Sequence, residues 1–128
     1  MNQHQHPFDT AIALRPEGEG AWQGQTSPAY GNMIGPFGGV TAAQALNAVL
    51  QHPKRLGEPV AYTVNFAAPV ADGPFLALAR PARTNRSTQH WIVEMRQGDA
   101  TVATATAVTA VRRDTWGGRD KRELVIED

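Results

Sequence analysis

A glycine-rich segment that leads into an alanine-rich stretch is the first place in this sequence where chemistry is expected. It runs from Gly35 to Val40 and puts Gly38 and Gly39 directly at the entry of an expected helix. Glycine lets the backbone approach a ligand closely, and the first N–H groups of a helix are free donors backed by the helix dipole. Such an end can hold a carbonyl oxygen as it gains negative charge. The alternative is that the glycines only permit a tight entry into a crowded core.

Three polar residues, Thr41, Gln44 and Asn47, recur at helical spacing within the apolar run that follows. They share one narrow stripe of the expected helix, so they must find partners or face a cavity. In one interpretation, Thr41 or Gln44 positions a water molecule near the helix start. In the other, the stripe satisfies backbone groups of neighbouring strands or borders a symmetry mate.

Arginines and histidines supply the remaining candidates. Arg80, Arg83 and Arg86 fall within one expected strand, where alternation puts Arg83 on the face opposite the other two. The planar guanidinium suits phosphate recognition, and a solvated strand face is the alternative. His52 is expected at a helix terminus, where a charged imidazole would be a favourable cap. The histidines show no spacing typical of a metal site, so neither a metal nor a cofactor is expected.

The elements that must position these residues follow from periodicity. Residues 40–51 lack Gly and Pro and stop at His52-Pro53, which predicts a helix surrounded by protein. Alternating apolar residues then predict a meander of four long strands at 60–70, 75–86, 88–97 and 100–111. Long antiparallel strands beside one buried helix predict an α+β fold whose curved sheet wraps around that helix.

Upstream of the helix, the sequence predicts a β-hairpin and a long loop. Phe8–Leu14 is expected as a short strand, Arg15–Gly18 as a turn and Gly20–Gln25 as the returning strand. Ser27–Gly39 consists mostly of loop-forming residues, and a loop this long in a small domain suggests a function.

Composition limits the class of protein. The chain has 128 residues, 12 basic and 12 acidic side chains, and no cysteine. We expect a single domain over 1–128, with its core at about 8–113 and a charged tail or linker at 114–128. Zero net charge argues against a nucleic-acid or membrane-surface partner. Without an apolar run of about 20 residues or a signal-peptide layout, a cytoplasmic location is expected.

The order of these elements resembles the hotdog fold. Residues 37–46, FGGVTAAQAL, look like the amino-terminal helix motif of the acyl-CoA thioesterase II-like family. The resemblance continues through Val64–Val70 and the strand that ends in Arg83–Arg86, and covers about residues 8–113. It implies a single hotdog domain that matches the amino-terminal one of the two units that family members usually hold in one chain.

The resemblance further implies binding and hydrolysis of a fatty acyl-CoA or related thioester between two hotdog units. A homodimer or a separate second unit would supply the missing half. The candidate residues are Gly38, Gly39 and Val40 for the thioester carbonyl, Asn32, Thr41 and Gln44 for catalysis, and Arg80, Arg83 and Arg86 for CoA phosphates. The family's catalytic aspartate has no counterpart on this helix, because no acid lies between Glu19 and Glu58. The competing hypothesis is therefore a non-catalytic acyl-CoA or lipid-binding module, or the structural half of a larger enzyme.

Overall fold

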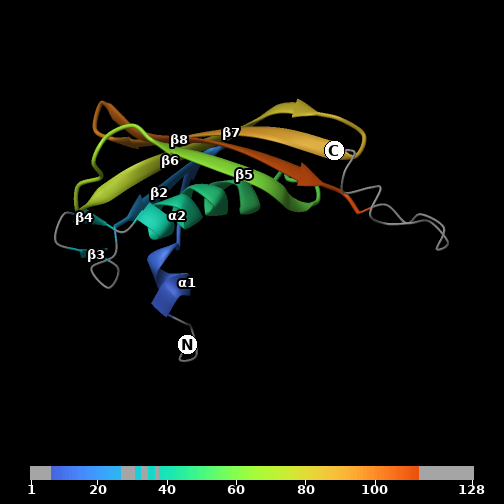
Figure 1. The fold of residues 1–128 in the computed structure, drawn as a ribbon. Coiled ribbons are helices and arrows are strands. Elements are labelled where there is room, and N and C mark those ends of the chain that lie inside the picture. The colour runs from blue at the N-terminus through green and yellow to red at the C-terminus, as the bar shows by residue number, and fades with distance from the viewer. Residues whose placement is uncertain (1–6, 27–30, 33–34, 37, 113–128) are drawn as a thin grey trace.

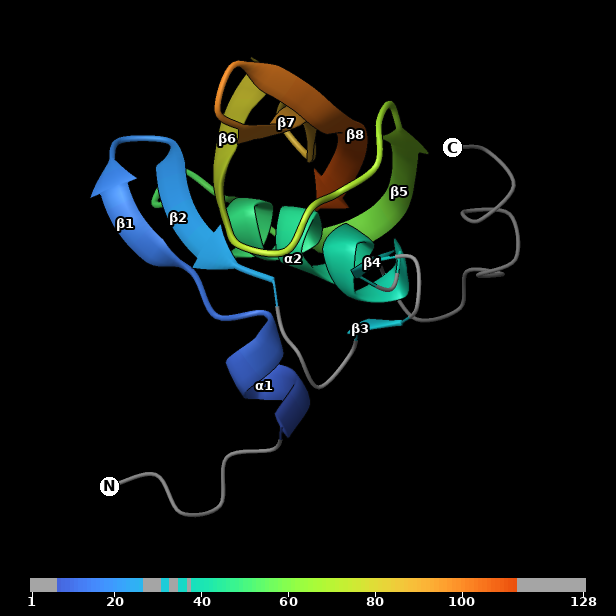
Figure 2. The same cartoon turned by 90° about the vertical axis from the view of Figure 1, so that its left-hand side faces the viewer.

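A long helix under a six-stranded antiparallel sheet makes up most of the computed structural model, which describes residues 7–26, 31–32, 35–36 and 38–112. The elements are α1 (Pro7–Ala11), β1 (Arg15–Gly18), β2 (Ala21–Gln25), β3 (Gly31–Asn32), β4 (Gly35–Pro36), α2 (Gly38–Leu50), β5 (Glu58–Phe66), β6 (Pro74–Thr84), β7 (Thr88–Gln97) and β8 (Ala100–Ala110). The sheet has the order β1-β2-β6-β7-β8-β5, and β3 and β4 pair separately. The large sheet curves over α2 (Figures 1 and 2). The α+β hotdog architecture predicted from the sequence is therefore confirmed.

Helix α2 confirms the prediction for residues 40–51, although it begins two residues earlier, at Gly38. Every residue from Val40 to Leu50 is buried or half-buried, as expected for a helix surrounded by protein. The helix ends ahead of Pro53, and the N–H of His52 donates to the carbonyl of Val49 at 3.1 Å. This hydrogen bond spans three residues instead of the four of a regular α-helix, so it tightens the last turn, as is common at helix ends.

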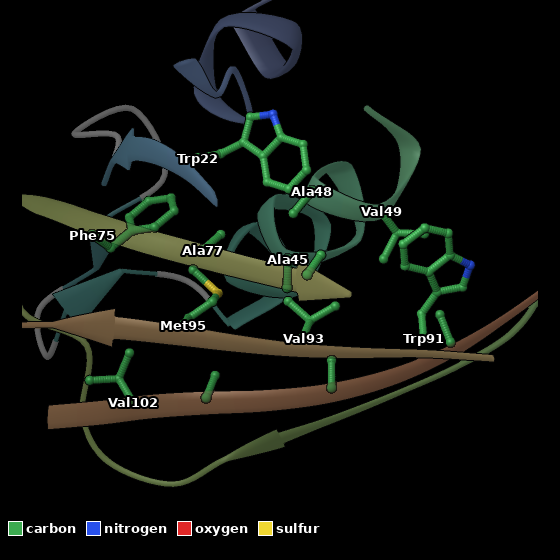
Figure 3. Packing of buried hydrophobic residues seen from close by; sticks show 14 residues of the cluster. Trp22, Ala45, Ala48, Val49, Phe75, Ala77, Trp91, Val93, Met95 and Val102 are labelled. Atoms are coloured by element: carbon green, nitrogen blue, oxygen red, sulfur yellow. The ribbon is translucent and has the colours of Figure 1, made fainter. Parts of the chain in front are cut away.

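Small side chains line the face of the sheet that covers α2. The inward-facing alanines of β6 and β8 are at most 3% exposed and belong to one core cluster with Ala45 and Ala48 of α2; they are Ala77, Ala79, Ala103, Ala105 and Ala107. Because alanine is short, the helix can lie close to the sheet along its length. The larger side chains of β7 fill the rest of this layer, namely Trp91, Val93 and Met95 (Figure 3). The alternation predicted for β7 is confirmed.

The prediction of a four-strand meander is wrong in one respect. Strands β6, β7 and β8 are consecutive neighbours, but β5 pairs with β8 and lies at the edge of the sheet. The chain after β5 must therefore cross from that edge to the interior position of β6. Periodicity reports which face of a strand is buried, but it does not specify the neighbour with which the strand pairs.

The amino-terminal hairpin is confirmed, but it lies later than predicted. Arg15–Gly18 is the strand β1 rather than a turn, and the chain reverses between Gly18 and Ala21. Gly20 has a φ of 76° and its carbonyl accepts a hydrogen bond of 2.8 Å from the N–H of Ala79 on β6. Glycine suits this position because it adopts a positive φ without strain.

The strand predicted for Phe8–Leu14 is wrong, because Pro7–Ala11 forms the short helix α1. Proline favours the first position of a helix, and Asp9 in the first turn complements the helix dipole. The apolar spacing of Phe8 and Ile12 fits one turn of helix as well as the parity of a strand.

The remaining predicted segments are described only in part. Of the loop predicted at 27–39, the structure describes β3, β4 and the first two residues of α2. The tail or linker predicted at 114–128 lies outside the described residues. Within the described ranges, no helix is long and apolar enough to cross a membrane.

Candidate functional site

The start of α2 lies against the last residue of β5. Gly38 opens the helix, and a side-chain carbon added to it would lie 3.3 Å from Cζ of Phe66. The tip of the Phe66 ring therefore lies close to Gly38, in the space beside a side chain at that position. The first N–H groups of any helix lack a partner within that helix, so Gly38, Gly39 and Val40 offer donors here. Gly39 is exposed and Gly38 half-buried, so the backbone of this end lies at the surface of the described structure.

Tyr62 makes a second contact between β5 and the beginning of α2. Its hydroxyl donates a hydrogen bond of 2.6 Å to the carbonyl of Ala42. Burial raises the pKa of Tyr62 well above its usual value, so the hydroxyl remains protonated and keeps donating. Neither Tyr62 nor Phe66 was predicted as a site residue from the sequence. The available signal was that both share the apolar parity of the strand that follows the helix.

Gln44 makes structural hydrogen bonds that join α2 to two other segments. Its side-chain nitrogen donates to the carbonyls of Ala11 and Gln25 at 2.9 and 3.1 Å. Asn47 likewise donates to the carbonyl of Ile12 at 2.8 Å. The interpretation that the polar stripe satisfies backbone groups is therefore confirmed for these two residues, although α1 and the residue after it supply two of the carbonyls. A catalytic role for Gln44 stays a prediction.

The other two catalytic candidates lie near the same end of the domain. Thr41 is 1% exposed and follows the helix-start donors directly. Asn32 belongs to β3, whose partner β4 leads into α2, and both short strands lie beside the start of the helix (Figures 1 and 2). The side chain of Asn32 lies outside the described part of the structure. The backbones of Asn32, Gly38 and Thr41 are thus brought to one end of the domain.

The three arginines lie on the outer face of the sheet or beyond it. Arg80 and Arg83 are exposed and pair with Ile92 and His90 of β7. The register shifts in β6 between these two arginines, so both face outward, and the prediction of opposite faces is wrong. Arg86 follows β6 in the connection to β7, at the end of the sheet away from β3 and β4 (Figure 1). Within one unit, the arginines are not brought together with the start of α2.

His52 is a buried structural residue, so its predicted role as a charged cap is wrong. It is 5% exposed, and its ring centroid lies 5.6 Å from that of Trp22 and 5.0 Å from that of Trp91. Its Nδ1 accepts a hydrogen bond of 3.1 Å from the N–H of Lys54. Burial lowers the pKa of His52, although the nearby Glu19 carboxylate opposes this effect. The neutral ring therefore joins the end of α2 to β2 and β7.

Helix α2 carries no charged or titratable side chain of its own. No three metal-ligating side chains come together among the described residues. A hollow of about 550 Å³ is lined by Glu17, Gln23, Leu76, Arg96 and neighbouring residues, away from the helix start. The residues described in a single unit thus place the start of α2 at the open edge of the sheet, beside β5.

Comparisons with solved structures identify the same architecture in several proteins. A hotdog-fold protein of unknown function from Alicyclobacillus acidocaldarius is 51% identical, with a TM-score of 0.82 over 91% of this chain and 44% of that one. The tesB protein of Mycobacterium avium subsp. paratuberculosis is 22% identical, with a TM-score of 0.74 over 86% of this chain and 44% of that one. An acyl-CoA thioesterase II from Mycobacterium marinum is 16% identical, with a TM-score of 0.70 over 88% of this chain and 42% of that one.

The chain therefore spans less than half the length of each of these solved proteins. A search of curated proteins found no match. A family model for the acyl-CoA thioesterase N-terminal domain matches residues 27–110. That range contains β3, β4, α2 and the four long strands that enclose the helix. Because the match covers all of these elements, the chain belongs to the acyl-CoA thioesterase N-terminal domain family.

Proposed function

We propose that this chain is a thioesterase-type domain that binds and hydrolyses an acyl-CoA or a similar thioester between two hotdog units. The observation that carries the proposal is the start of α2 at Gly38 and Gly39, which opens beside the edge strand β5. Its N–H groups can hold the thioester carbonyl oxygen as that atom gains negative charge. Family membership supports this substrate class. Roles in the cytoplasm and in fatty acid metabolism stay predictions.

Hydrolysis at this site would use a water molecule that attacks the thioester carbonyl carbon. The N–H groups of residues 38–40 would hold the oxyanion of the tetrahedral intermediate. Its collapse would break the C–S bond, and the CoA thiolate would leave with the bonding electrons and take up the proton released by the attacking water. Asn32, Thr41 and Gln44 are the candidates for positioning the water. Gln44 already donates to two carbonyls, so only its side-chain oxygen is left to accept a hydrogen bond from that water.

We propose that the arginines bind CoA phosphates only when two hotdog units are paired. Arg80, Arg83 and Arg86 are exposed and lie away from the helix start of their own unit. A nucleotide bound against one unit would therefore have to meet the arginines of the other. Bidentate contacts with phosphate oxygens would suit their guanidinium groups.

Pairing is proposed to occur along β5. This edge strand has nine residues, and its exposed apolar side chains include Val60 at 65% and Phe66 at 54%. The opposite edge strand, β1, has four exposed residues, including Arg15, Pro16 and Glu17. Charge, proline and short length protect a sheet edge from pairing. In β5, Glu58 and Pro59 occupy only the first two of nine positions, so the rest of β5 is the edge better suited to pairing. A second copy, or a separate second unit, would complete the site.

A non-catalytic acyl-CoA or lipid-binding module is the second candidate. The specific observation in its favour is that α2 carries no titratable side chain to act as a general base. Gln44, the polar residue nearest that role, is engaged by the backbone of α1 and β2. In this case the domain would bind the ester and leave the chemistry to a second unit.

A panel of acyl-CoA esters assayed for release of free thiol distinguishes the two candidates. Gly39→Val crowds the helix start, and Ala100→Val puts the same side chain at an exposed site at the start of β8 as the matched control. Turnover that collapses only in Gly39→Val supports hydrolysis at the helix start. No turnover, with thermal stabilisation by CoA esters, supports the binding module. An absence of both turnover and stabilisation rejects both candidates.

Sedimentation velocity tests the pairing. Val60→Lys puts a charge on the β5 edge and should convert a dimer into monomers, whereas Thr104→Lys, on the exposed outer face of β8, should not. A wild-type chain that remains monomeric at micromolar concentration would contradict the homodimer.

A further inference from the structure

Exposed large apolar side chains concentrate at one edge of the described structure. Five such residues are exposed, and Leu56, Val60 and Phe66 of these lie in β5 or just before it. Phe66 is the only aromatic among the five and remains 54% exposed. An aromatic ring contributes most when it is buried, so a half-exposed ring beside a candidate site indicates a ligand surface.

Phe66 lies on the helix side of the sheet rather than on the outer face. It pairs with Ala103, which is completely buried under α2. Its Cζ, Cε1 and Cε2 atoms are the atoms that a side chain on Gly38 would meet, at 3.3 to 3.7 Å. The tip of the ring therefore lies beside the first residue of the helix, and Phe66 remains 54% exposed.

The position of the ring is held by a neighbouring contact. Tyr62 lies four residues earlier on the same face of β5, and its hydroxyl binds the carbonyl of Ala42, one turn into α2. Two contacts thus join β5 to the first turn and a half of the helix. Because the strand cannot slide along the helix without breaking both, the ring is already placed beside the helix-start N–H groups before any ligand arrives.

We propose that Phe66 is a specificity-determining residue that forms the apolar wall of the acyl site. The ring contacts the part of the acyl chain next to the thioester carbonyl and keeps water away from the N–H groups that hold the carbonyl oxygen. Acyl groups long enough to cover the ring are then bound more tightly than an acetyl group. This inference rests on the proposed thioester-binding function.

The test compares Phe66→Ala and Phe66→Leu with the wild type, using octanoyl-CoA and acetyl-CoA as substrates. We expect Phe66→Ala to raise KM for octanoyl-CoA about tenfold, because roughly half of a phenylalanine side chain is left to be covered. KM for acetyl-CoA should change less than about twofold, since that acyl group is too short to gain from the contact. Phe66→Leu should restore most of the octanoyl preference. Ile92→Ala, which removes an exposed apolar side chain from the outer face, is the matched control.

Sedimentation velocity on the same variants separates this role from a contribution to pairing. The inference is overturned if Phe66→Ala changes KM equally for the two substrates. It is also overturned if the rise in KM for octanoyl-CoA disappears at protein concentrations where Phe66→Ala is fully paired. If the wild type hydrolyses neither ester, calorimetry with a non-hydrolysable octanoyl thioether of CoA gives an independent readout. Weaker binding of this analogue by Phe66→Ala, with unchanged binding of CoA alone, would then support the inference although hydrolysis had failed. Unchanged binding of the analogue would reject it.

Discussion

Replacing Gln44 by leucine tests whether this buried amide braces the fold. Gln44 is 2% exposed and links α2 to Ala11 and Gln25 through hydrogen bonds of 2.9 and 3.1 Å. Leucine is similar in size but cannot donate a hydrogen bond, so the substitution removes both bonds without leaving a large cavity. The carbonyl of Ala11, a residue that is only 4% exposed, loses its partner.

The expected cost follows from the burial of the two carbonyls. A buried acceptor without a partner costs about 1–3 kcal/mol, which applies to Ala11. Gln25 is exposed, so its carbonyl can turn to water and should cost about 1 kcal/mol or less. Burial of the leucine side chain offsets about 1 kcal/mol. The net loss of unfolding free energy is about 1–2 kcal/mol, or a fall in Tm on the order of 5 °C for a domain of this size.

Urea unfolding followed by tryptophan fluorescence measures this cost, since Trp22 and Trp91 are both buried in the core. Asn47→Leu is the matched control because it removes a single hydrogen bond, to the carbonyl of Ile12, from the same stripe. It should lower the unfolding free energy by about half as much as Gln44→Leu. Equal unfolding midpoints for wild type and Gln44→Leu would refute the brace. Turnover lost at unchanged stability would instead favour a catalytic role for the amide.

Two further tests concern the backbone conformation at Gly57 and the protonation of His52. Gly57→Ala should cost about 3 kcal/mol or more, because Gly57 has a φ of 79° and a Cβ there would overlap the Ala110 carbonyl. Gly98→Ala, at a φ of 61° in open space, should cost only about 1 kcal/mol, and equal urea midpoints would exclude the overlap. Burial lowers the pKa of His52 below its usual 6.5. The unfolded chain therefore binds a proton at His52 more readily than the folded chain, and the free energy of unfolding falls as the pH drops through and below 6.5. His52→Phe should flatten the dependence of unfolding free energy on pH between about 7 and 5, and an unchanged slope would contradict a neutral buried His52.

Features that depend on a few neighbouring residues were predicted well from the sequence. The Ala-rich run that stops before Pro53 identified α2, because helix propensity and the restriction before proline act locally. Alternation identified the bounds of β7 and its buried Trp91. The same local argument failed for α1, where the spacing of Phe8 and Ile12 fits both a helical turn and a strand.

Features that depend on distant residues could not be predicted in this way. The pairing of β5 with β8 and the register shift that turns Arg83 outward are decided by packing across the whole sheet. The partners of Gln44 lie 33 and 19 residues away along the chain. A polar residue in an apolar stripe shows that partners must exist, but it does not identify them.

The candidate site combines both kinds of information. By itself, the sequence determined that a glycine-rich entry precedes a buried helix, and its motif indicated the thioesterase family, since these signals are contained in consecutive residues. Only the tertiary structure decided that Phe66 and Tyr62 flank this entry and that the entry opens at an unpaired sheet edge. The physical reason is that periodicity records how deeply each residue is buried, whereas contacts between elements are chosen by the joint packing of all of them.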